Sequence, residues 1–161
     1  MSNTSSAPKK ARSSGAKIPT TLLVTVIPVA VALNIVGGII ASALRLPVYL
    51  DMIGTAVAAI VLGPWWGALV GLLTNSGSAL ISGPTSLPFA LVNIVGALIW
   101  GYGVRSWGLG KSIPKFFLLN IIVAIACTLV AAPIIVLVFG GATGAGADAL
   151  TATFLAIGQG V

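Results

Sequence analysis

The chain has 161 residues, of which 58% are hydrophobic and only 6% are charged, whereas soluble domains carry about 25% charged residues. So few charged side chains cannot cover a water-soluble fold of this size. The composition therefore excludes an ordinary cytosolic domain, a disordered chain and a disulfide scaffold. It predicts an all-α, polytopic membrane protein.

The inventory of reactive side chains argues against catalysis. The chain has no His, two acids (Asp51 and Asp148) and a single cysteine, Cys127. These residues cannot build a Ser-His-Asp triad, a His-based metal site or a disulfide. We therefore expect a protein that is not an enzyme and has no bound metal or cofactor. Cys127 lies in an apolar run, and we interpret it as a small core residue.

Residues 1–17 are rich in Ser, Lys and Ala and have no apolar periodicity. This composition predicts a disordered basic tail on the cytoplasmic side. A signal peptide is the alternative, but the apolar run 18–44 is too long for one and no A-x-A cleavage site ends it. An uncleaved first span is the better interpretation.

The rest of the chain, residues 18–161, is predicted to form one transmembrane domain. Its apolar segments cover residues 18–44, 50–62, 65–81, 87–104, 115–139 and 147–161. The second segment would extend only about 20 Å as a helix, so it is a short span. The last has about 15 residues and no polar flank, so we expect a short or truncated sixth helix. The pattern predicts a six-helix bundle.

The basic residues predict how the bundle is oriented. Seven of the eight Lys and Arg residues lie in the tail or around residues 105–115, and an even number of predicted spans separates these two clusters. The positive-inside rule then places both clusters, and the N-terminus, in the cytoplasm. Because the clusters flank apolar segments, we interpret them as topology signals rather than as a nucleic-acid site. All four Trp residues fall at this same predicted interface.

Polar side chains within the spans mark a candidate substrate-binding site. Asn34, Asn75 and Asn93 stand on three different segments, each about 9–15 Å below the outer end of its helix. Asp51 and Thr55 lie at the top of the short second segment. Two interpretations stay open. In the first, the amides form hydrogen bonds between helices and bind no ligand. In the second, they line a pocket that is open to the outside. Asp51 has the further alternative of an N-cap for the second segment.

Small residues recur at four-residue spacing in several segments. Gly67 and Gly71 form a GxxxG pattern, and Gly37 and Ala41 form a similar pair in the first segment. Such pairs let helices approach closely, either within the bundle or at a partner subunit. Packing within the bundle is the commoner explanation.

One stretch carries a family resemblance. Residues 44–80, LRLPVYLDMIGTAVAAIVLGPWWGALVGLLTNSGSAL, together with ALNIVGG before them, resemble the substrate-binding S component of energy-coupling factor (ECF) transporters. The blocks that carry the likeness are LPVYLD, GT, LGPWWG and VGLLTN. Similar blocks also occur in membrane-sensing regions of some bacterial signalling proteins.

The resemblance implies a six-helix bundle in a prokaryotic cell membrane that binds a vitamin or similar small molecule from the outer face. It implies three partners beside lipid, namely a transmembrane coupling subunit and two cytoplasmic ATPases. Gly37 and Ala41 are the nearest match to the family's Ala-x-x-x-Ala docking motif. The connections 45–51 and 82–86 are the implied lids.

Two other functions stay open beside import. One is a membrane sensor module without transport, and the other is a purely structural assembly subunit. For the ligand, one carboxylate near the mouth (Asp51) slightly favours a cationic or neutral molecule over an anion, although nearby Arg45 weakens that preference.

Overall fold

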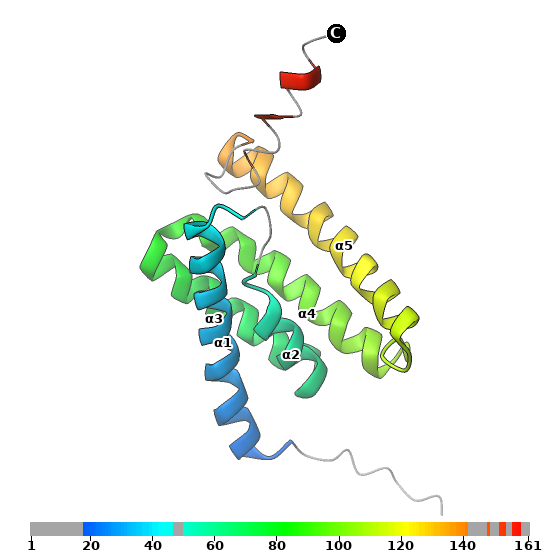
Figure 1. The fold of residues 1–161 in the computed structure, drawn as a ribbon. Coiled ribbons are helices and arrows are strands. Elements are labelled where there is room, and N and C mark those ends of the chain that lie inside the picture. Colours follow the sequence, from blue (N-terminus) through cyan, green and yellow to red (C-terminus); the bar gives the residue numbers. More distant parts are fainter. Residues whose placement is uncertain (1–17, 47–49, 142–147, 149–151, 154–155, 159–161) are drawn as a thin grey trace, which may run out of the picture.

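The computed structural model describes residues 18–46, 50–141, 148, 152–153 and 156–158. These residues form helices and no strand, which confirms the all-α prediction (Figure 1). The predicted tail 1–17 and most of the predicted sixth segment lie outside the described residues. The main elements are α1 (Thr20–Ala43), α2 (Ile53–Val61), α3 (Pro64–Ser82), the 3-10 helix η1 (Pro84–Phe89), α4 (Ala90–Arg105) and α5 (Ile113–Phe139).

Three described stretches are long and apolar enough to cross a membrane, namely Thr20–Ala43, Pro84–Arg105 and Ile113–Phe139. The nine residues of α2 extend only about 14 Å, too little to span the hydrocarbon core on their own. α1 and α5 bury few side chains in the bundle and expose large apolar ones, such as Leu137, which is 82% exposed. These apolar faces suit a lipid surround.

Two helix starts differ from the sequence predictions. The fourth segment begins as the 3-10 helix η1, because Pro84 and Pro88 supply no N–H and favour a short, tighter turn. α2 begins at Ile53 with Met52 as its N-cap, and no side chain bonds to that cap. The N-cap role predicted for Asp51 is therefore wrong. Its side chain interacts with Asn93 of α4 instead.

Glycines allow the central helices to pack closely. A Cβ on Gly67 of α3 would lie 2.5 Å from the Cβ of Ala59 in α2, and a Cβ on Gly71 would lie 2.7 Å from the Cβ of Asn93 in α4. Both glycines are buried. The GxxxG pattern therefore packs within the bundle, as the commoner explanation predicted.

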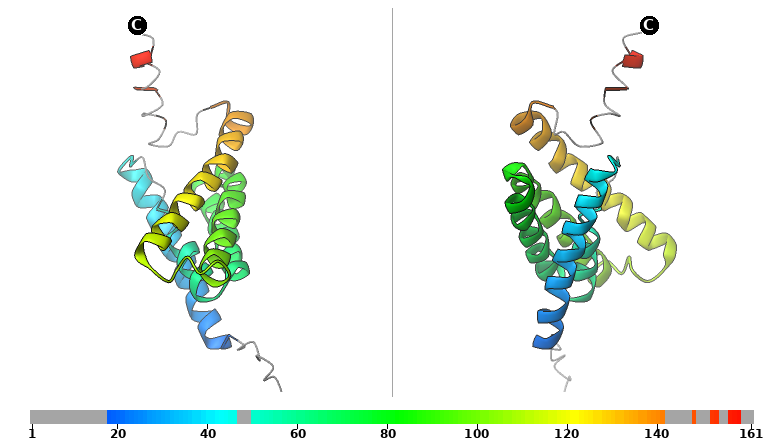
Figure 2. Two further views of the ribbon diagram at one scale, coloured as in Figure 1. Left: turned by 90° about the vertical axis from the view of Figure 1, so that its right-hand side faces the viewer. Right: turned by 60° about the vertical axis from the view of Figure 1, so that its left-hand side comes forward.

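The two ends of the helical bundle differ in the elements that form them. The C-terminal ends of α1 and α5 lie toward η1 at one end, and the connection between α4 and α5 lies toward the opposite end, as does the N-terminal end of α1 (Figures 1 and 2). At this second end Arg105 donates from Nη2 to the carbonyl oxygen of Val61 at 2.9 Å. It thereby satisfies a free carbonyl at the C-terminus of α2. We call these the η1 end and the basic end.

Candidate functional site

A buried hydrogen-bond network joins the first four helices. Asn34 of α1 donates from Nδ2 to Thr55 Oγ1 at 2.9 Å and to Thr74 Oγ1 at 3.0 Å. Its Oδ1 accepts from the backbone N–H of Gly54 at 2.6 Å. Thr55 Oγ1 in turn donates to Asn93 Oδ1 at 2.9 Å. Every side chain in this network is at most 1% exposed. Here the amide bonds helices to one another, as the first interpretation predicted.

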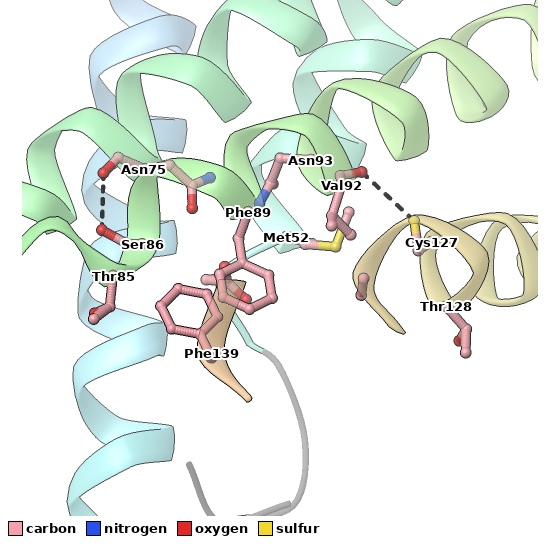
Figure 3. Close-up of a pocket in the computed structure, with 12 residues that line it drawn as sticks. Met52, Asn75, Thr85, Ser86, Phe89, Val92, Asn93, Cys127, Thr128 and Phe139 are labelled. Carbon is pink, nitrogen blue, oxygen red and sulfur yellow. Dashed lines mark hydrogen bonds between the residues drawn. The ribbon is translucent and has the colours of Figure 1, made fainter. Parts of the chain in front are cut away.

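A cavity of about 300 Å³ lies beside this network at the η1 end (Figure 3). Its walls come from η1, α3, α4, α5 and the connection before α2. Asn34 and Thr55 do not line it, whereas three other predicted site residues do. The lining residues are Asp51, Met52, Asn75, Thr85, Ser86, Phe89, Val92, Asn93, Cys127, Thr128, Ala131 and Phe139.

The network fixes which atoms of the two amides can reach the cavity. Asn93 uses Oδ1 to accept from Thr55, so its Nδ2 is left to interact with Asp51. Asn75 donates from Nδ2 to the carbonyl oxygen of Gly71 at 2.9 Å. Its Oδ1 accepts no hydrogen bond within the described part of the chain, and Figure 3 shows the amide directed toward the cavity. Asn75 therefore presents a free acceptor there.

Asp51 is the only charged residue among the described residues that line the cavity. It lies in the connection between α1 and α2, outside the three stretches long enough to span a membrane. Burial raises the pKa of Asp51 above its ordinary value, and smaller opposing effects come from a backbone hydrogen bond and from the side chain of Asn93. The site therefore holds a carboxyl group whose charge the described residues around it compensate only in part.

Two aromatic rings close one side of the cavity. Phe89 of η1 and Phe139 of α5 stack with their ring centroids 5.8 Å apart and their planes at 5°. Neither residue stands out in the sequence, because each lies at an end of a uniformly apolar segment where nothing distinguishes it from lipid-facing neighbours. Thr85 and Ser86 fall within the 82–86 connection that the resemblance implied as a lid.

A second cavity, of about 470 Å³, runs between α1 and α3 and shares Asp51, Asn75 and Ser86 with the first. Ala41 lines it and is 7% exposed. A Cβ on Gly37 would lie 2.7 Å from the carbonyl oxygen of Leu50. Gly37 thus packs against Leu50 of this chain's own α1–α2 connection, whereas Ala41 lines the second cavity.

The described residues contain no group of three or more His, Cys, Asp or Glu side chains that could hold a metal ion. The chemistry of the cavity is instead that of hydrogen bonds, one carboxyl group and aromatic faces. Comparison with protein-family models, curated proteins and solved structures gave no match to this chain.

Proposed function

We propose that this protein is a substrate-capture subunit of an ATP-driven, ECF-type importer, which binds a vitamin or similar small molecule from the outer face of the cell membrane. The observation that carries the capture role is a cavity at one end of an apolar bundle, whose largely apolar wall includes the buried amides Asn75 and Asn93. Polar groups are costly in hydrocarbon unless they are bonded or used. The free acceptor of Asn75 has no structural partner among the described residues, and a ligand would supply one.

The distribution of charge supports an outward-facing cavity. Arg105, Lys111 and Lys115 lie at the basic end, opposite the cavity. Trp65 and Trp107 are 68% and 56% exposed toward that same end, as interfacial aromatic residues are. With the basic end in the cytoplasm, the cavity faces outside and the chain enters the membrane from the cytoplasm. The proposed bundle has six spans.

The energy supply is assigned to other subunits. This part of the proposal rests on the resemblance of residues 44–80 to ECF S components. It is supported by the absence from the sequence of a Gly-rich loop with the Lys that a nucleotide cradle needs. A coupling membrane subunit and two cytoplasmic ATPases would complete the importer.

Purification of the tagged chain from its own membranes tests the proposal. We expect mass spectrometry to identify a second polytopic membrane protein and two ATP-hydrolysing subunits in the same complex. The variant Asn75→Leu is the matched control, because it should lose the ligand but keep the partners. A covalently linked kinase-type domain would instead favour the sensor function. Uptake that persists without any ATPase would contradict the importer.

A further inference from the structure

Two of the three hydroxyl groups at the cavity wall, those of Ser86 and Thr128, already donate their protons within the bundle. Ser86 Oγ donates to the carbonyl oxygen of Asn75 at 3.1 Å, and Thr128 Oγ1 donates to the carbonyl oxygen of Ala124 at 2.8 Å. Each of these oxygens therefore offers lone pairs to a ligand rather than a proton. Together with Oδ1 of Asn75 and the carboxyl group of Asp51, they make the wall rich in acceptors.

Donors at the same wall are few. The amide nitrogen of Asn75 is bonded to its own helix, and that of Asn93 interacts with Asp51. The hydroxyl of Thr85 has no partner among the described residues and is the main donor left. A ligand that matches this wall must bring hydrogen-bond donors of its own.

Among the described residues, no Lys or Arg lines either cavity beside Asp51. Arg45, the nearest basic residue in sequence, is exposed and lines neither cavity. The chain has no Lys or Arg after Lys115, so the segment that follows α5 cannot bring one to the η1 end. The other basic residues that the structure describes, Arg105, Lys111 and Lys115, lie at the basic end. A partly buried carboxylate that no described cation neutralises is costly, and a bound cation would lower that cost.

We propose that the cavity selects an organic cation of the ammonium or amidinium type. Its protonated nitrogen donates to Asp51 and to Oδ1 of Asn75, and its flat apolar part lies against Phe89 and Phe139 (Figure 3). The aromatic faces add an attraction for a positive charge and for a planar group. This inference rests on the proposed capture function, because it names the class of molecule that the same cavity takes.

Matched probes can test the charge preference. The purified wild-type protein in detergent is titrated with benzamidinium, benzamide and benzoate, and with ring-substituted and extended homologues of each, while its thermal unfolding is followed. The three classes share a planar ring and differ in charge and in donor count. We expect the amidinium class to stabilise the protein most. Asp51→Asn should weaken amidinium binding about 30-fold or more.

Two variants complete the design. Asp148→Asn removes the only other acid, which does not line the cavity, and should leave the amidinium preference intact. Asn75→Leu removes the acceptor oxygen but keeps the carboxyl group, and should reduce the preference even if Asp51→Asn does not fold.

The outcomes separate the two proposals. Stabilisation by neutral or anionic probes alone would overturn the cation preference and leave the capture function standing. Amidinium binding that is unchanged in both Asp51→Asn and Asn75→Leu would overturn the assigned site. Absence of stabilisation by every class would count against the capture function as well.

Discussion

Asn34 and Asn75 are chemically identical side chains with different surroundings. Asn34 donates both amide hydrogens to side chains of α2 and α3, and its oxygen accepts from the backbone of α2. Asn75 bonds only to the backbone of its own helix and leaves its oxygen at a cavity wall. The first holds helices together, whereas the second is available to a ligand.

Leucine substitution should separate these two roles. Asn34→Leu leaves the N–H of Gly54 buried without an acceptor, so it should lower the free energy of unfolding by about 1–3 kcal/mol. Asn75→Leu breaks one bond within a single helix and should cost less than about 1 kcal/mol. Unfolding of both variants in the same detergent measures the difference. If both variants lost the same free energy of unfolding, the two amides would contribute equally to stability, which would contradict the separate roles.

Asp51 should make the stability of the ligand-free protein depend on pH. Its pKa is raised in the folded state, so folding favours the protonated form. The resulting stability is fully present below the unfolded pKa and is lost as the pH rises through the folded pKa. Asp51→Asn should remove this loss, so that its melting temperature exceeds that of the wild type by a few degrees at high pH. Asp148→Asn should keep the wild-type profile. A wild-type profile that is flat over this range would contradict the account.

The sequence predicted part of the site. Asp51, Asn75 and Asn93 could be found because a polar residue in an apolar segment stands out. Asn34 stood out equally. Only the packed structure shows that its donors and its acceptor are all bonded to other helices. Phe89 and Phe139 gave no signal, because the rotation of a helix that is apolar on every side cannot be inferred from its periodicity.

At the scale of the element, glycine determines how closely α2, α3 and α4 approach. Gly67 of α3 faces the backbone of α2, where a Cβ would lie 2.7 Å from the Cα of Ala59. Gly77, two to three turns later on the same helix, faces only the terminal methyl group of Ile35 at 3.0 Å. Backbone atoms cannot give way, whereas the end of a flexible side chain can.

The two glycines should therefore respond differently to alanine. Gly67→Ala forces α2 and α3 apart and should lower the free energy of unfolding by about 1–3 kcal/mol. Gly77→Ala gains helix propensity and should be neutral or stabilising by up to about 1 kcal/mol. Thermal unfolding of the pair is the measurement. If Gly67→Ala proved as stable as Gly77→Ala, the close packing of α2 against α3 would be refuted.

The helices themselves were more predictable than their ends. Five apolar segments were located to within a few residues, because hydropathy alone reveals long apolar helices. The start of α4 was less predictable, since Pro84 and Pro88 allow either a turn or a 3-10 helix. The start of α2 was also less predictable, because Met52 rather than Asp51 is its N-cap. The side chain of Asp51 instead interacts with Asn93, a tertiary contact that the local sequence does not reveal.

At the scale of the whole molecule, the account requires the cavity and the basic residues on opposite sides of the membrane. Single cysteines introduced into a Cys127→Ala background can report this. Ser82→Cys at the η1 end should react with a membrane-impermeant maleimide in intact cells. Lys111→Cys at the basic end should react only after permeabilisation. Both side chains are exposed, so a reversed labelling pattern would mean that the cavity opens to the cytoplasm.

The central claim is that the cavity holds a small molecule through Asn75 and its neighbours. Mass spectrometry of molecules that co-purify with the protein tests it most directly, with Asn120→Leu as the control. Asn120 is an amide on α5 that bonds to Trp100 and does not line the cavity. We predict one organic molecule bound to the wild type and to Asn120→Leu, and its loss from Asn75→Leu. The same molecule retained in equal amount by Asn75→Leu would contradict the account.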